Sequence, residues 1–118
     1  MSIASDAPRG GFTDTLAVHV RTFCLTNAEI ERFEDKHRGV FALWDAFFSN
    51  APSPTATEVK DLLALGLIGG GMKAADADKV VSDLKPEHLL ESYQLAQAIL
   101  GAAFMPDAAT EEEPDEKK

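Results

Sequence analysis

Two helix start signals of the same kind set the framework of this chain. Thr26–Glu29 and Thr55–Glu58 each place a threonine three residues before a glutamate. In such a capping box the threonine hydroxyl and the glutamate carboxylate satisfy backbone N–H groups that the first turn of a helix leaves without partners. Apolar residues at helical spacing follow both boxes, so the sequence predicts a helix at each.

After the first box, apolar residues recur at three- and four-residue steps, which is typical of an amphipathic helix with one buried face. We expect Gly39 to divide this segment, because glycine weakens a helix interior by about 1 kcal/mol relative to alanine. Pro52 and Pro54 end the segment. The stripe consists of Ile30, Phe33, His37, Val40 or Phe41, Trp44, and Phe47 or Phe48.

The second half of the chain predicts further helices. The second capping box opens a helix that stops at glycines 69–71, and Gly66 in its apolar stripe allows a neighbouring helix to approach closely. Residues 74–84 suit a short helix. Pro86 occupies the favoured first position of a long final helix that ends near Phe104. The expected fold is therefore mainly α, a compact bundle of four to five helices with a short N-terminal β-strand or hairpin.

The β prediction rests on residues 14–26, where apolar and polar residues alternate as in a half-buried strand. The alternation continues in the opposite parity at Phe23 and Leu25. A bulge or turn near Arg21 and Thr22 is therefore needed for both sets to face one core. One bent strand and a hairpin remain equally compatible with the pattern. The first apolar set is Leu16, Val18 and Val20.

Length and charge indicate one acidic domain. A chain of 118 residues is the size of a single domain, and we expect a flexible leader at 1–13, a helical domain at 14–105 and a disordered acidic tail at 106–118. The formal net charge is −9, and residues 107–118 alone hold six acids and two lysines. Because phosphate contacts need a clustered positive surface, nucleic acid is not an expected partner.

The sequence also argues against a membrane protein. The longest apolar run, Leu62–Ile68, contains a glycine and is far shorter than the roughly 20 residues of a membrane span. The first residues lack the pattern of a signal peptide, and Cys24 is the only cysteine, as suits a reducing compartment. We therefore expect a cytoplasmic protein with no membrane partner.

No polar cluster has the spacing of a catalytic or metal site. The histidines lie on three different predicted elements, whereas zinc needs three or four convergent donors. Glycines 69–71 precede Met72 and Lys73 and lack the Gly-Lys-Ser/Thr ending of a phosphate loop. We therefore expect no enzymatic activity, no metal and no cofactor. The three histidines are His19, His37 and His88.

The order of these features resembles a known family. A β segment ends in Phe-x-Leu-Thr at 23–26, a glutamate-rich helix follows, and the Leu-Gly-Leu-Ile-Gly-Gly-Gly stretch at 65–71 precedes a helix ending Ile-Leu-x-Ala-Ala-Phe at 99–104. Over residues 14–105 this resembles the small tail proteins of bacterial gene transfer agents and related tailed phages, described as tail assembly chaperones. The usual turn dipeptide between two strands is missing here.

The resemblance implies a non-enzymatic role in building a phage-like tail, in which the protein binds the tape-measure protein and assists assembly of the tail tube protein around it. A homo-oligomer is compatible with that role, although no residue pattern specifies a symmetry. The alternative is a small acidic helical adaptor or regulatory protein, related to helix-turn-helix proteins through the helices that flank glycines 69–71, which binds another protein.

A chaperone for a helical, apolar client needs an accessible hydrophobic face. A body of about 100 residues struggles to bury every large apolar group, so part of the aromatic cluster is expected to stay exposed for a partner. The predicted protein-binding residues are Phe41, Trp44, Phe48, Leu63, Leu67 and Tyr93.

Overall fold

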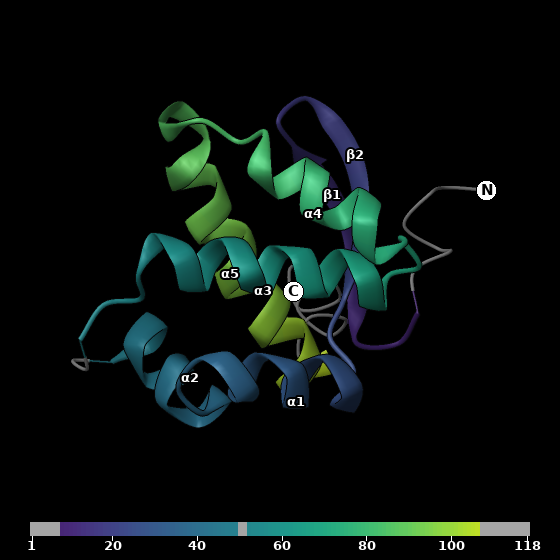
Figure 1. The fold of residues 1–118 in the computed structure, drawn as a ribbon. Coiled ribbons are helices and arrows are strands. Elements are labelled where there is room, and N and C mark those ends of the chain that lie inside the picture. Colours follow the sequence, from purple (N-terminus) through teal and green to yellow (C-terminus); the bar gives the residue numbers. More distant parts are fainter. Residues whose placement is uncertain (1–7, 50–51, 107–118) are drawn as a thin grey trace, which may run out of the picture.

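The computed structural model describes residues 8–49 and 52–106. Within them it has five α-helices, one short 3-10 helix and a two-stranded antiparallel sheet (Figure 1). The mainly α prediction with an N-terminal β element is therefore confirmed. The elements are β1 (Gly11–Leu16), β2 (His19–Cys24), α1 (Asn27–Lys36), α2 (Val40–Phe48), α3 (Ala56–Gly69), α4 (Ala74–Ser82), η2 (Pro86–His88) and α5 (Leu89–Phe104).

The N-terminal element is a hairpin, not one bent strand. Its register pairs Leu16 with His19, so the turn consists of Ala17 and Val18. The expected turn near Arg21 and Thr22 was therefore placed too late. Strand β1 also begins at Gly11, inside the segment expected to be a flexible leader; residues 1–7 lie outside the described part. The turn reverses the parity, so that Leu16 and Phe23 are both buried.

Helices α1 and α2 separate at Gly39, as predicted. At the start of α1, the Glu29 carboxylate accepts the backbone N–H of Thr26 at 3.1 Å and also its hydroxyl. At the start of α2, the Glu34 carboxylate accepts the backbone N–H of Val40 at 2.9 Å. A carboxylate near the first residue of each helix also interacts favourably with the positive end of the helix dipole.

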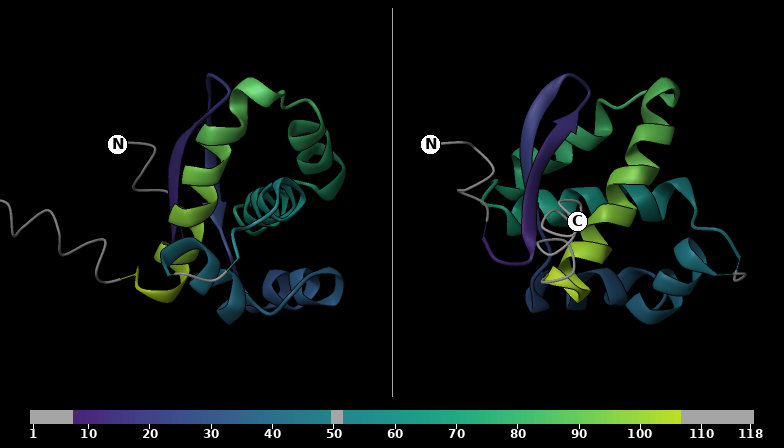
Figure 2. Two further views of the ribbon diagram at one scale, coloured as in Figure 1. Left: turned by 90° about the vertical axis from the view of Figure 1, so that its left-hand side faces the viewer. Right: turned by 180° about the vertical axis from the view of Figure 1, so that it is seen from behind.

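Helix α3 lies at the centre of the molecule. The left view of Figure 2 shows it end-on, with α1 and α2 beneath it, α4 on one side and α5 with the hairpin on the other. It contacts α1, α4, α5 and β2. The second capping box forms as predicted, because the Thr55 hydroxyl accepts the N–H of Glu58 and the Glu58 carboxylate accepts the N–H of Thr55. The buried residues of α3 are Glu58, Val59 and all positions from Leu62 to Leu67.

Glycines allow the close contacts around α3. A Cβ atom added at Gly66 would lie 3.0 Å from Cδ1 of Ile99, so this position brings α5 close, as predicted. A Cβ at Gly69 or Gly70 would collide with the backbone of β2. The end of α3 therefore packs directly against the strand.

The C-terminal half follows the predicted boundaries. Pro86 opens the 3-10 turn η2, which leads into α5.

No helix within 8–49 or 52–106 is long and apolar enough to span a membrane. The predicted acidic tail lies, from residue 107 onward, outside the described residues.

Candidate protein-binding surface

Helix α2 carries more apolar side chains than its buried face can accommodate. Its sequence is Val-Phe-Ala-Leu-Trp-Asp-Ala-Phe-Phe, with Asp45 as the one charged residue. The buried face consists of Val40, Leu43, Ala46 and Phe47. Phe41 and Phe48 project from the other side, with 78% and 46% of their surface exposed. Contiguous exposed apolar surface of this kind often marks an interaction site.

The exposed rings of Phe41 and Phe48 are joined into a continuous row by two half-buried rings, Trp44 and Phe104 at the end of α5. The ring of Phe104 lies 6.0 Å from Phe41 and stacks on Trp44 at 5.2 Å, and Trp44 lies 4.3 Å from Phe48. These centroid separations are within the range in which aromatic pairs attract each other. We call Phe41, Phe104, Trp44 and Phe48 the aromatic row.

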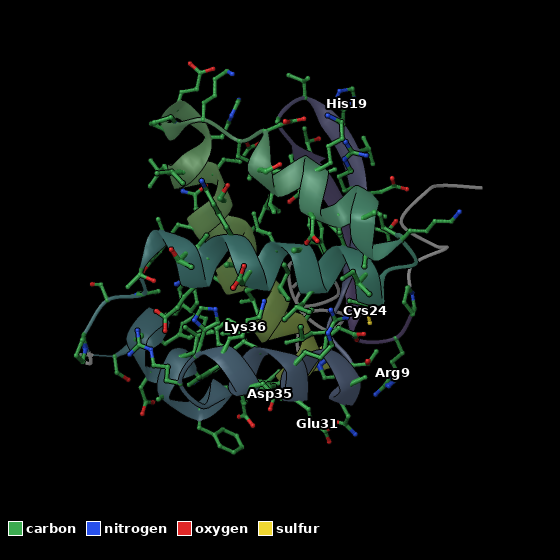
Figure 3. The ribbon with its side chains drawn as sticks, in the orientation of Figure 1. Arg9, His19, Cys24, Glu31, Asp35 and Lys36 are labelled. Carbon is green, nitrogen blue, oxygen red and sulfur yellow. The ribbon has the colours of Figure 1, made fainter. Side chains whose placement is uncertain are left out.

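A groove of about 750 Å³ opens beside one end of the aromatic row. It runs between α1, α2 and the last turn of α5, and its polar lining residues are Thr26, Asn27 and the acidic Glu34. Glu31, one helical turn before Glu34, lies on the exposed side of α1 (Figure 3). The groove therefore combines an apolar surface with negative charge. Its apolar lining is Leu25, Ile30, Val40, Phe41, Ala103 and Phe104.

The structure divides the predicted binding residues into three groups. Phe41, Trp44 and Phe48 lie together in the aromatic row. Leu63 and Leu67 have no exposed surface because both are in the core, so they contribute nothing to a surface that a partner contacts in this conformation. Tyr93 is half-buried, with its ring 5.0 Å from Phe47.

Phe104 is the member of the row that sequence reasoning did not include. It ends the apolar stripe of α5, and that stripe gives no indication that its last ring meets Trp44 of a helix far away in the sequence. The same holds for the groove, because Ile30 and Ala103 share it only through the tertiary arrangement.

His37, Asp61 and Cys24 are polar residues that lie outside both the aromatic row and the lining of the groove. Nε2 of His37 lies 2.6 Å from Oδ2 of Asp61, which joins the end of α1 to α3. Burial, and then the nearby Glu29 carboxylate, raise the pKa of the Cys24 thiol, which disfavours the reactive thiolate form. Within 8–49 and 52–106, no three His, Cys, Asp or Glu side chains converge as metal ligands would.

The chain belongs to a family of phage tail proteins. A family model described as "Phage tail tube protein, GTA-gp10" matches residues 9–106, which is nearly all of the described structure. The resemblance to tail proteins of gene transfer agents and phages is thus confirmed at the level of the family. No curated protein and no solved structure gives a match.

Proposed function

We propose that this protein is a tail assembly chaperone that binds an apolar helical segment of the tape-measure protein while tail tube subunits assemble around it. The family supports a part in a phage-like tail. The observation that carries the chaperone role is the aromatic row, which leaves Phe41 mostly and Phe48 about half exposed on a protein with a well-packed core.

The proposed binding mode is a helix in a groove. An amphipathic helix places apolar residues at three- and four-residue steps into a hydrophobic groove. The aromatic row and the groove beside it together form an apolar surface that such a helix can contact. Aromatic residues dominate the binding energy of many interfaces. The role requires packing and no bond-breaking step, so we propose neither a catalytic residue nor a cofactor.

Co-expression with the tape-measure protein tests the proposal. We expect the native chain to keep the tape-measure protein soluble and to co-elute with it during gel filtration. The double variant Phe41→Ala/Phe48→Ala should lose the complex while keeping its thermal midpoint near that of the native protein, since both rings are exposed. Failure of the native chain to form a complex would exclude the proposal.

Leu90→Ala is the matched control. Leu90 is also a large apolar residue, 72% exposed, but it lies at the beginning of α5, whereas Phe104 of the aromatic row lies at its end. The control variant should bind the tape-measure protein as the native chain does. Equal loss of binding in both variants would show that the aromatic row is not the docking surface.

The description of the matching family favours a second candidate, a subunit of the tail tube itself. A tube subunit polymerises and remains in the finished tail, whereas a chaperone leaves. Electron microscopy of the purified chain and mass spectrometry of mature particles separate the two roles. Regular tubes, or near-stoichiometric retention of the chain in particles, would favour the tube subunit.

A further inference from the structure

A second pocket, of about 480 Å³, lies between the hairpin and α4. In Figure 1 these elements are at the top of the molecule, whereas α1 and α2 are at the bottom. Its volume is in the range typical of ligand sites. Its lining combines apolar side chains with charged ones from both elements. The apolar part of the lining consists of Leu16, Ala17, Met72, Val80 and Leu84.

The pocket lies between a row of side chains on β2 and a row of side chains on α4. On β2, His19 and Arg21 share a face with the buried Phe23, because side chains alternate along a strand; Figure 3 shows His19 near the hairpin tip. On α4, Asp76, Lys79, Val80 and Asp83 line the pocket, and their three- and four-residue spacing places them on one helical face. The pocket is therefore formed by two ordered elements.

Arg21 is the unexplained group in this pocket. Its Nε atom is buried and has no hydrogen-bond partner within the described part of the chain. Its cross-strand neighbour is Asp14, but Oδ1 of Asp14 instead accepts the backbone N–H of Thr15 at 2.7 Å. Arg21 as a whole is half-buried, so it is the single Nε donor that lacks an acceptor. A buried donor without an acceptor is destabilising, and such groups in proteins usually have a reason.

We propose that this pocket binds a carboxylate on a short apolar stem, namely the aspartate or glutamate side chain of a partner polypeptide together with an adjacent apolar side chain. Because Nε is buried, the two Nη atoms of the planar Arg21 guanidinium are the groups that can donate parallel hydrogen bonds to a carboxylate. The apolar part of the lining receives the neighbouring side chain, and Lys79 and His19 are further donors that line the pocket.

The acidic residues of the pocket restrict the ligand. Asp83 is within 3.4 Å of the Lys79 ammonium, and Asp76 lines the same face of α4. Both repel ligands with several negative charges, so phosphate and nucleic acid are disfavoured relative to a single carboxylate. The lining of this pocket shares no residue with the aromatic row, so the two surfaces are separate.

Two peptides that differ only in the carboxylate test the proposal. The probes are N-acetyl-Leu-Glu-amide and N-acetyl-Leu-Gln-amide, titrated into the isotope-labelled full chain and followed by NMR. We expect the glutamate peptide to shift the Arg21 Nε–H and the Val80 signals saturably. The glutamine peptide should bind at least about tenfold more weakly, because it lacks the charge-assisted pair. Equal binding of the two peptides would overturn the proposal.

Variants distinguish a ligand-binding arginine from a structural one. Arg21→Gln should lose the glutamate peptide, whereas Arg32→Gln, an exposed arginine on α1, should keep it. Arg21→Met should have an unchanged or higher unfolding midpoint, because it removes an unsatisfied buried donor. A clear loss of stability in Arg21→Met would mean that the arginine supports the free fold and would overturn the proposal.

Two further binding measurements identify the source of the carboxylate and test this proposal independently of the proposed function. If the acidic residues 107–118 of this chain compete for the pocket, a chain ending at Pro106 should bind the glutamate peptide several-fold more tightly. Unchanged affinity would point to a different polypeptide. The Phe41→Ala/Phe48→Ala variant should still bind the peptide, so the two proposals can fail independently.

Discussion

Arg38 and Glu58 form a two-point ion pair between the α1–α2 connection and the first turn of α3. Nε of Arg38 donates to Oε2 of Glu58 at 2.9 Å, and Nη2 donates to Oε1 at 3.0 Å. The same Nη2 also contacts the carbonyl oxygens of Pro52 and Ser53 at 3.3 Å. One side chain therefore holds the α2–α3 connection against the start of α3.

Removing the guanidinium should destabilise the fold. We expect Arg38→Met to lower the free energy of unfolding by about 1 to 3 kcal/mol, because it leaves the buried Glu58 carboxylate without its charged partner. Urea denaturation followed by circular dichroism measures this change. The control is Lys79→Met, which removes an exposed pair on α4 and should change stability by less than about 0.5 kcal/mol. Similar losses in both variants would contradict the expectation.

The same ion pair predicts a dependence of stability on pH. Burial alone would raise the pKa of Glu58, but the Arg38 hydrogen bond, the Thr55 backbone hydrogen bond and the Arg38 charge together lower it below its ordinary value of 4.5. A carboxyl whose pKa is lower in the folded state stabilises the fold at higher pH. This contribution is lost as the pH falls from 4.5 through the lower pKa of the folded state.

Denaturation midpoints measured in a series of buffers from neutral pH to below the ordinary carboxyl pKa test this linkage. The native chain should lose stability more steeply in the acid range than Arg38→Met, because the variant lacks the main interaction that lowers the pKa of Glu58. Parallel pH profiles for the two proteins would show that the ion pair does not carry the effect.

A further prediction about stability concerns the contact between α3 and β2. In Gly69→Ala the new Cβ would lie 2.0 Å from the carbonyl oxygen of Cys24, so the helix end and the strand must move apart. We expect a loss of about 1 to 3 kcal/mol, as for other overpacked sites. In Gly101→Ala the Cβ meets nothing within 4 Å, and this helical position should gain up to about 1 kcal/mol. Thermal unfolding of both variants should show midpoints shifted in opposite directions.

Local sequence signals were sufficient for the helices but not for their surroundings. Capping boxes, Gly39 and Pro86 mark boundaries through short-range chemistry, and those boundaries were predicted. How many helices and strands pack around α3 depends on the tertiary structure, which local sequence signals do not specify. Its stripe looked one-sided in the sequence, but helix α3 is surrounded, so Leu63 and Leu67 are in the core although they were predicted to bind a partner.

The aromatic row was predictable only in part, for the same reason. The surplus of large rings on α2 is visible in the sequence, and Phe41 and Phe48 are exposed as a short chain with limited core volume would require. The contribution of Phe104 depends on where α5 ends relative to α2 in space. Periodicity within either helix carries no information on that distance.

The hairpin turn was missed because its residues are unusual for such a turn, and this leads to the last prediction. Ala17 and Val18 have φ values of 50° and 66°, a conformation that two-residue turns normally give to Asn-Gly and that is strained for a β-branched residue. We expect Val18→Gly to stabilise the protein by about 1 kcal/mol or more, because the strain is relieved and the 87% exposed side chain buries almost nothing. Val20→Gly is the control, since Val20 lies within strand β2, where glycine should destabilise by about 0.5 to 1 kcal/mol. Urea denaturation of the two variants gives the comparison, and a less stable Val18→Gly protein would contradict the assignment of strain to this turn.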